Sequence, residues 1–364
     1  MRPYSSCSSK LEQMAKKIPL RNIWLLFLYA ADLVRFKGSL NVETEVARDL
    51  PELVARLLVR VVRERLRRNL SRGYQPKHAV LARVRGRIDM LGTDTGQLLD
   101  RGRIACHFEE HTMDTPRNRL VRAALDYLAL MVNAPAVAHD CRSLSHGLGR
   151  LGVSAQKPTR AAIAADPISR NETADLLMVG LAKMAFEALI PSEQTGSSPA
   201  VAVDANVYLV RRLFEKAVAN ALRIKLQTLG WQVQHGRKLS WPIDGASETI
   251  RAHLPSMQTD IELVHVGQKR KLVIDTKFTQ IFGATRYREE VLKSGYLYQL
   301  YAYLRTQESE LEARGIQSEG MLLHPQVGGA LDEYIELQGH RMRFKTIDLT
   351  AVPDDFEGQL LGIV

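Results

Sequence analysis

The sequence contains little cysteine and no long apolar run. Its three cysteines, Cys7, Cys106 and Cys141, are too few and too scattered for a disulfide framework or a cysteine-based zinc site. The most apolar stretch, residues 23–34, includes Asp32 and is far shorter than the roughly 20 residues of a membrane-spanning helix. These absences exclude a disulfide-stapled secreted protein and a membrane protein.

Residues 1–19 are polar and contain no apolar core followed by a small-residue cleavage site, so we expect no signal peptide. We interpret this segment as a flexible N-terminal extension and expect a cytoplasmic protein. The chain contains neither an internal repeat nor a low-complexity tract.

Composition and charge indicate a soluble globular protein with a polyanionic partner. Hydrophobic residues make up 45% of the chain and charged residues 25%, which excludes a disordered chain. The length corresponds to about two domains at roughly 150 residues each. Lysine and arginine number 50 against 40 aspartate and glutamate, a net charge of +10. This surplus indicates nucleic acid, an acidic protein or anionic lipid as the partner, without distinguishing among them.

The hydrophobic pattern divides the chain at a cluster rich in Pro, Gly and Ser, residues 191–200, which we interpret as a linker. Before it, apolar spacing predicts helices at 20–35, 49–72, 118–132 and 174–190, with short strands between residues 80 and 107. After it, the pattern predicts helix 206–228, strands 230–235, 257–265 and 270–276, helix 289–306, and strands 318–323 and 333–346. We therefore expect an N-terminal mixed helix–strand domain, 20–190, and a C-terminal domain, 201–364, of mixed α/β or α+β class in the order αβββαβ.

The stretch MQTDIELVHVGQKRKLVIDTKF, residues 257–278, predicts a β-hairpin with its turn at 266–269. Asp260 lies in the first strand, and Asp275 and Lys277 end the second on one face, because side chains alternate along a strand. Pairing across the turn would bring Asp260 close to Asp275. Two such carboxylates suit Mg²⁺, and a neighbouring lysine orients or deprotonates an attacking water. The set therefore suits metal-assisted hydrolysis of a phosphodiester.

An Asp-x-Lys triplet alone occurs by chance, and an Asp–Lys ion pair at a sheet edge is the structural alternative. Three further residues extend the pattern. Glu215, in the preceding helix, is a candidate third acidic group, and Gln299 and Tyr303 lie four apart on one face of the following helix. A solvated helix face is the alternative for the Gln–Tyr pair.

Taken in order, Glu215, Asp260, Asp275-Thr-Lys277 and Gln299-x-x-x-Tyr303 resemble the PD-(D/E)xK nuclease core, although Thr259 stands where the motif has its proline. More narrowly, the chain resembles the McrC family, the nuclease subunits of McrBC modification-dependent restriction systems. That resemblance rests on IPLRNIWLLFLYA (18–30), VRGRID (84–89), DTPRNRLVRAAL (114–125), LFEKAV (213–218), QTDIEL (258–263), LVIDTKF (272–278), YLYQLYAYL (296–304) and LHP (323–325).

The resemblance implies a prokaryotic, cytoplasmic endonuclease subunit of a GTP-dependent system that restricts DNA with modified cytosine. Its partner would be a hexameric AAA+ GTPase, McrB, which recognises methylated double-stranded DNA. Residues 20–190 would dock on that ring and stimulate its GTPase, and residues 201–364 would cut DNA with Mg²⁺. The chain has no G-x-x-x-x-G-K-[ST] phosphate loop, so the nucleotide site is expected on the partner.

The resemblance also implies roles for single residues. Asp260, Asp275 and Lys277 would be catalytic, with Glu215, Gln299 and Tyr303 as lesser candidates, and the carboxylates Asp260, Asp275 and Glu215 would hold the metal. Two alternatives stay open. One is a non-catalytic adaptor of a ring NTPase with a decayed nuclease fold, and the other is a stand-alone repair nuclease of the RecB branch.

Other motifs of the N-terminal half are less specific. Seven arginines between residues 56 and 72 indicate either a contact surface for DNA or the partner, or a solvated helix face. Arg85 and Arg87 would lie at a polar tip that could trigger the partner's GTPase. His107-x-x-Glu110-His111 matches an inverted zinc-protease motif but lies in a strand-like run, and the G-x-G-x-x-G at 147–152 is interpreted as a loop, so both matches are rejected.

Overall fold

The computed structural model describes residues 17–39, 47–168, 172–189, 201–283, 291–313 and 315–364, and it divides into two compact units. Residues 45–190 form one, here called the arm unit, and residues 1–44 with 191–364 form the other, the sheet unit. Two expected segments lie outside the described residues: the first sixteen residues of the N-terminal extension predicted at 1–19, and the linker predicted at 191–200. Within the described part of the chain, no helix is long and apolar enough to cross a membrane.

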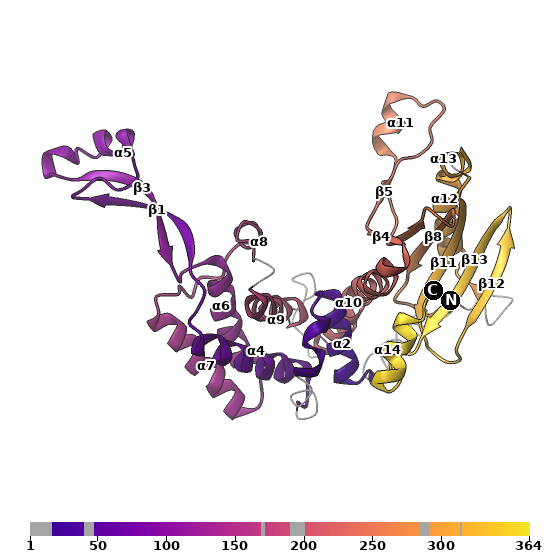
Figure 1. The fold of residues 1–364 in the computed structure, drawn as a ribbon, viewed down its shortest axis with the longest axis horizontal. Helices are drawn as coiled ribbons and strands as arrows, with labels where there is room; N and C mark the ends of the chain where they lie inside the picture. Colours follow the sequence, from indigo (N-terminus) through magenta and orange to yellow (C-terminus); the bar gives the residue numbers. More distant parts are fainter. Residues whose placement is uncertain (1–16, 40–46, 169–171, 190–200, 284–290, 314) are drawn as a thin grey trace, which may run out of the picture. The chain divides into compact units, whose positions relative to one another are not determined.

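The body of the arm unit is a group of packed helices (Figure 1). They are α4 (Leu50–Arg67), α6 (Pro116–Met131), α7 (Pro135–Arg150), α8 (Arg160–Ala164) and α9 (Thr173–Leu189). The apolar face of α4, with Leu53, Leu57 and Leu58 fully buried, packs against α6, α7 and α9. The side chain of Asp49 accepts a hydrogen bond from the backbone N–H of Glu52 and so caps the start of α4.

Two sequence interpretations of this unit are wrong. Helix α4 ends at Arg67 rather than at residue 72, because residues 73–81 pair as a strand. The glycines of the G-x-G-x-x-G run at 147–152 were expected in a loop, but Gly147 and Gly149 lie inside helix α7. A Cβ at Gly149 would lie 3.0 Å from the guanidinium of Arg122, so a larger residue there would require that side chain to shift.

A small antiparallel sheet extends from these helices as an arm, residues 73–112 (Figure 1). Its strands are β1 (Gly73–Leu81), β2 (Arg87–Ile88) and β3 (Ile104–Thr112), in the order β1-β3-β2, and the β2–β3 connection contains α5 (Met90–Thr95) and the 3-10 turn η2 (Leu99–Arg101). Only three arm residues, Thr93, Ala105 and Cys106, are buried. The arm therefore has almost no hydrophobic core of its own.

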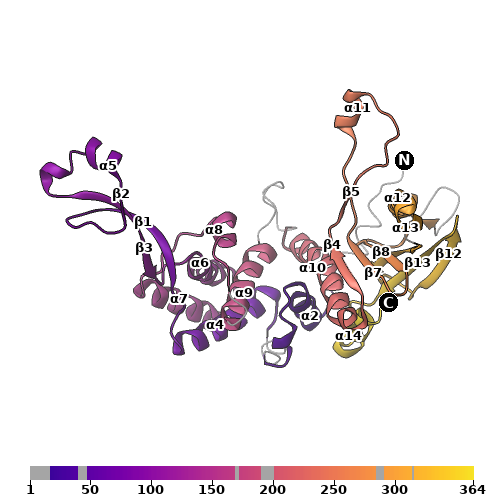
Figure 2. The same ribbon diagram turned by 45° about the horizontal axis from the view of Figure 1, so that its top comes forward.

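The sheet unit is built on a six-stranded mixed sheet in the order β12-β13-β11-β8-β7-β4 (Figure 2). The strands are β4 (Gln232–His235), β7 (Ile261–His265), β8 (Arg270–Thr276), β11 (Gln317–Pro325), β12 (Asp332–Leu337) and β13 (His340–Ile347). Strands β8, β11 and β13 are parallel, and the remaining pairings are antiparallel. The mixed α/β class expected from the sequence is confirmed.

Helices and short strands complete the sheet unit. They are α2 (Leu20–Ala30), η1 (Val34–Ser39), α10 (Val201–Leu226), η3 (Gln227–Leu229), β5 (Lys238–Leu239), α11 (Glu248–His253), β6 (Met257–Gln258), β9 (Phe282–Gly283), β10 (Val291–Leu292), α12 (Ser294–Thr306), α13 (Glu308–Ala313) and α14 (Pro353–Leu361). Helix α12 packs on β8 and β11, with Leu300 and Leu304 against Val273 and Leu322. The strand expected at 333–346 is a hairpin of two strands, because Gln338 and Gly339 adopt the left-handed backbone of a tight turn.

The first helix belongs to the sheet unit, in contrast to the expected domain 20–190. Helix α2 packs against α10 and α14. The side-chain amide of Asn22 donates to the backbone carbonyls of Leu349 (2.9 Å) and Ala351 (2.8 Å), and that of Asn220 donates to Tyr29 (3.0 Å) at the other end of the helix. These tertiary contacts, across more than half of the chain, assign α2 to the C-terminal half.

Candidate functional site

The β7–β8 hairpin carries the centre of the candidate site. His265 pairs with Arg270 and Ile261 with Ile274, so the turn occupies residues 266–269, as expected from the sequence. Continuing this register by one residue sets Asp260 opposite Asp275. The two carboxylates therefore lie near one another where the hairpin opens, and the negative charge of Asp260 raises the pKa of Asp275.

Asp275 is completely buried near the end of the interior strand β8. Burial, followed by the negative charge of Asp260, raises its pKa to about 6. The ammonium of Lys277 lies 2.9 Å from Oδ2 and 3.0 Å from Oδ1 of this carboxylate, and it forms a hydrogen bond with Oδ1. The backbone N–H of Lys277 donates to the carbonyl of Leu323 on β11 (2.9 Å), which extends the parallel pairing and holds Lys277 beside Asp275.

Asp260 is oriented by the strand opposite it. Its Oδ2 accepts hydrogen bonds from the backbone N–H (2.7 Å) and the hydroxyl (2.9 Å) of Thr276. Among the described residues, no hydrogen bond reaches its Oδ1. Burial is the largest influence on this carboxyl and raises its pKa in spite of the Thr276 hydrogen bonds. A free oxygen next to a second carboxylate is a suitable ligand for a hard cation.

Glu215, on helix α10, turns toward β4 rather than fully into this pair. Its Oε1 lies 2.8 Å from Nε2 of His235, and this hydrogen bond is the main reason that the pKa of Glu215 is lowered and that of His235 raised. Both side chains are about two-fifths exposed. The charges of Asp260 and Glu215 still act on one another, so Glu215 and His235 lie at the edge of the site.

The helical pair Gln299 and Tyr303 is not a solvated face. Tyr303 is buried, accepts a hydrogen bond from Gln299 Nε2 (2.6 Å) and donates one to the carbonyl of Gln258 (2.7 Å). Gln258 lies two residues before Asp260, so the tyrosine connects helix α12 to the segment that carries the carboxylate. Burial raises the pKa of Tyr303, and the charges of Asp275 and Asp260 contribute. The pair therefore supports the hairpin from the α12 side.

The donor set fits a magnesium ion held by two carboxylates. Within the described part of the chain, Asp275 Oδ2 is buried and receives no hydrogen bond, and its charge is compensated there by the Lys277 ammonium 2.9 Å away, so a metal ion would add a second cation to a buried carboxylate. Mg²⁺ commonly binds one or two carboxylates and completes its shell with water and phosphate oxygens. Glu215, the expected third ligand, fits less well. Among the described residues, its carboxylate does not form with those of Asp260 and Asp275 a group whose ligand atoms all lie within 4.8 Å of one another.

Sequence reasoning missed two histidines at this site. His235 was expected only as part of a strand, and His324, in the LHP segment of β11, was given no role. His324 is buried, its Nδ1 lies 2.8 Å from the carbonyl of Thr279, and burial lowers its pKa to about 4. Its position at the carboxyl end of β11, beside the end of β8, could have been inferred only from the parallel pairing of the two strands.

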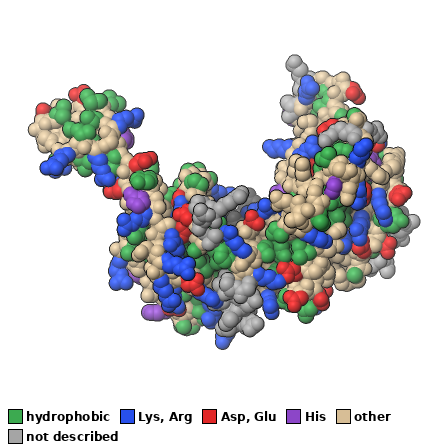
Figure 3. Space-filling model, viewed as in Figure 1, with side chains coloured by type: hydrophobic (Ala, Val, Ile, Leu, Met, Phe, Trp, Pro, Cys, Tyr) green, Lys and Arg blue, Asp and Glu red, His purple; other side chains and the backbone are tan. Residues whose placement is uncertain are grey.

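In the arm unit, much of the positive charge of α4 is used for internal contacts. Four of the seven arginines, Arg56, Arg60, Arg63 and Arg65, pair with Glu52, Glu64, Asp140 and Asp175 respectively. Figure 3 accordingly shows blue side chains mixed with red ones on these helices. This favours the solvated or internally paired interpretation for those four over a continuous DNA-binding face.

The DTPRNRL segment anchors the arm. Asn118 is fully buried, and its Nδ2 donates to the carbonyls of Ser71 (2.9 Å) and Met113 (2.8 Å), which precede β1 and follow β3. Arg119 forms a two-pronged ion pair with Asp114, with contacts of 2.7 and 2.6 Å. One amide therefore ties together the two strands that leave the helical body.

Known proteins resemble this chain along most of its length. A profile of the McrBC 5-methylcytosine restriction system component family matches residues 6–325. The type IV methyl-directed restriction enzyme EcoKMcrBC of Escherichia coli strain K12 is 24% identical over 333 residues, which cover 91% of this chain and 93% of that protein. A solved half-complex of Thermococcus gammatolerans McrB AAA+ hexamers with bound McrC aligns with a TM-score of 0.48 and 15% identity, over 94% of this chain and 76% of that chain.

Proposed function

Since the chain belongs to the McrBC 5-methylcytosine restriction system component family, we propose that it is the DNA-cleaving subunit of a GTP-dependent restriction system directed against modified cytosine. The observation that carries this proposal is the pairing of Asp260 opposite Asp275, with the ammonium of Lys277 2.9 Å from the buried carboxylate. This arrangement supports the proposal that the three residues act as the acidic pair and lysine of a PD-(D/E)xK nuclease. The name of the E. coli relative, a methyl-directed restriction enzyme, supports the choice of substrate.

Asp275 Oδ2 and Asp260 Oδ1 are the atoms that would hold Mg²⁺. When bound, Mg²⁺ supplies Lewis-acid polarisation of the phosphate and lowers the pKa of its bound water. Thr276 keeps Asp260 oriented through its two hydrogen bonds, and burial keeps bulk water from Asp275. The two acids repel one another when both are ionised, and this repulsion is relieved by a cation.

Lys277 has two tasks in this proposal. It compensates part of the negative charge of Asp275, and its ammonium donates toward the attacking water or the phosphate oxygens, where negative charge increases during hydrolysis. Tyr296, whose ring centroid lies 5.4 Å from the ammonium, limits the positions open to it. Gln299 and Tyr303 are positioning residues, since they hold the segment before Asp260 and touch neither acid.

We propose that the partner is a McrB-type AAA+ GTPase and that the arm unit docks on it. The chain belongs to the McrBC restriction system component family, and its exposed arm carries basic side chains that suit contact with a neighbouring assembly. Arg87 is exposed on β2, and the guanidinium of Arg85 lies over the ring of Phe108 at 4.2 Å. Such cations could assist GTP hydrolysis by stabilising the charge that develops during phosphoryl transfer.

The test is cleavage of a methylated plasmid by this protein and a McrB-type GTPase, in the presence of GTP and Mg²⁺. We compare the wild type with Asp275→Asn and Lys277→Ala, with the exposed Asp244→Asn as a matched control. The proposal expects cleavage by the wild type and the control only, with stimulation of GTP hydrolysis retained by all four proteins. Stimulation without cleavage by any of them would favour the adaptor alternative, and cleavage by Asp275→Asn would locate the nuclease elsewhere.

A further inference from the structure

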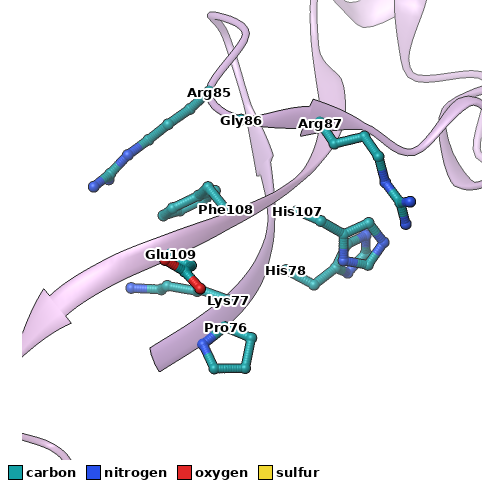
Figure 4. A pocket seen from close by; sticks show the side chains of 9 residues that line it. All are labelled: Pro76, Lys77, His78, Arg85, Gly86, Arg87, His107, Phe108 and Glu109. Carbon is teal, nitrogen blue, oxygen red and sulfur yellow. The ribbon is translucent and has the colours of Figure 1, made fainter. Parts of the chain in front are cut away.

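A second cluster of potential metal ligands lies on the arm. Among the described residues, only His78, Asp89 and His107 form a group whose ligand atoms all lie within 4.8 Å of one another. His78 and His107 are directly paired on β1 and β3, and Asp89 follows β2, which pairs with β3 at His107. Figure 4 shows the two imidazole rings side by side at one edge of a pocket on the arm sheet.

The distances within the cluster match a tetrahedral coordination sphere. Asp89 Oδ2 lies 3.2 Å from His78 Nε2 and 3.5 Å from His107 Nε2. Ligands bound tetrahedrally to zinc at about 2.0–2.1 Å lie about 3.3 Å from each other along each edge of the tetrahedron. The two distances from the carboxylate to the imidazoles are therefore those that a zinc ion would impose, and all three residues offer ligand atoms within 4.8 Å of one another.

The carboxylate is oriented before any ion arrives. Asp89 caps helix α5, and its Oδ1 accepts a hydrogen bond from the backbone N–H of Gly92 (2.9 Å), which leaves Oδ2 facing the histidines. That hydrogen bond is also the main reason that the pKa of Asp89 is lowered, so the carboxylate is ionised at neutral pH. A Cβ at position 92 would lie 2.6 Å from Oδ2, and glycine therefore leaves room at the ligand oxygen. Fixed partners of this kind raise the metal affinity of a ligand.

We propose that His78, Asp89 and His107 bind a divalent transition-metal ion such as Zn²⁺, which fastens β1 and β3 to the segment between β2 and α5. Two imidazole nitrogens and one carboxylate suit Zn²⁺ and its neighbours, whereas Mg²⁺ and Ca²⁺ prefer oxygen ligands. The site is thus chemically distinct from the carboxylate pair of the sheet unit. The histidine side chains are 49% and 47% exposed, so water completes the coordination.

The arm needs a stabilising device of this kind. With only Thr93, Ala105 and Cys106 buried between residues 73 and 112, it gains little from the hydrophobic effect. Small structures with such cores are commonly stabilised by disulfides or metal ions, and Cys106 is a free, buried cysteine. The His107-x-x-Glu110-His111 run is unsuitable as a zinc-protease helix because it lies on β3, yet its first histidine meets two ligands from other segments.

The test is competition for Zn²⁺ between the full-length protein and a chromogenic zinc chelator, in excess Mg²⁺ so that the oxygen site of the sheet unit is saturated. The variants are His78→Gln, His107→Gln and Asp89→Asn. Asparagine keeps an oxygen for the Gly92 N–H and so preserves the α5 cap. The matched control is His111→Gln, also exposed on β3 but outside the cluster.

We expect the wild type and His111→Gln to retain one more equivalent of Zn²⁺ than the three ligand variants, with an affinity loss of at least about 10-fold in each variant. Zinc should also slow amide hydrogen exchange in residues 73–112 of the wild type and leave that of Asp89→Asn unchanged. If the wild type loses Zn²⁺ to the chelator as readily as Asp89→Asn does, the proposal is wrong. It is equally wrong if zinc slows exchange in both proteins alike.

Discussion

Replacing Asp275 by asparagine should stabilise the metal-free protein while abolishing cleavage. The carboxyl of Asp275 has a pKa raised from 3.8 to about 6, first by burial and then by the charge of Asp260. At 1.36 kcal/mol per pKa unit, ionising this buried group costs the fold about 3 kcal/mol relative to the unfolded chain. Asparagine has nearly the same shape and carries no charge, so the variant avoids that cost.

The sign of the effect follows from the raised pKa. The folded wild type holds the Asp275 proton more tightly than the unfolded chain does, so the stability that this group contributes is fully present below pH 3.8 and is lost as the pH rises through about 6. The stability difference between Asp275→Asn and the wild type should therefore be small near pH 4 and approach about 3 kcal/mol at neutral pH. Mg²⁺ should reduce this stability difference, because it binds and stabilises only the folded wild type.

The assay is urea denaturation in the presence of a chelator, at several pH values. All three tryptophans, Trp24, Trp231 and Trp241, lie in the sheet unit, so fluorescence follows the unfolding of the unit that contains Asp275. The exposed Asp244→Asn is the control and should behave like the wild type. If Asp275→Asn is no more stable than the wild type at neutral pH, the inference of a strained, buried carboxylate pair is refuted.

Three further predictions concern other parts of the molecule. A fragment of residues 201–364 should be less stable by several kcal/mol than the same fragment fused to residues 17–39, because α2 buries Trp24, Leu26 and Leu28 at about 1.5–3 kcal/mol per side chain; urea denaturation followed by far-UV circular dichroism compares the two. Asn118→Ala should remove the side-chain hydrogen bonds to the carbonyls of Ser71 and Met113, of which only the latter keeps a bond from the Thr115 N–H, and cost about 1–3 kcal/mol, measured as faster hydrogen exchange in β1 and β3. Glu215→Gln should lower the pKa of His235, because the hydrogen bond that the imidazole donates to the Glu215 carboxylate is the main cause of its raised value; NMR titration of the imidazole measures this, and an unchanged pKa would contradict the contact.

Local sequence patterns were sufficient for the hairpin of the candidate site. The continuous apolar and β-branched residues of LVID predict an interior strand, and the turn at 266–269 sets a register in which Asp260 faces Asp275. Both features depend on neighbours within about 20 residues, and strand pairing across a short turn leaves few alternatives. The same holds for α4, α6 and α12, whose apolar spacing marks a buried face.

Contacts between distant segments were beyond such reasoning. The sequence suggested that Glu215 joins the two aspartates, but β4 brings His235 within 2.8 Å of it, and nothing near Glu215 in the chain indicates that contact. Gln299 and Tyr303 were compatible with a solvated face until the hydrogen bond to Gln258 identified them as supports of the hairpin. Likewise, His107 finds its partners His78 and Asp89 only when three strands come together.

The sequence by itself determined the secondary structure of most of the chain, the mixed α/β class and the carboxylate hairpin, because each depends on periodicity and turn chemistry that act over short distances. Only the tertiary structure decided that α2 packs with the C-terminal half and which polar side chains meet at each site. Those outcomes depend on the burial of apolar faces and on hydrogen bonds between residues up to 329 positions apart, such as that from Asn22 to Ala351. Many folds satisfy the same local patterns, and the packing of distant faces selects one of them.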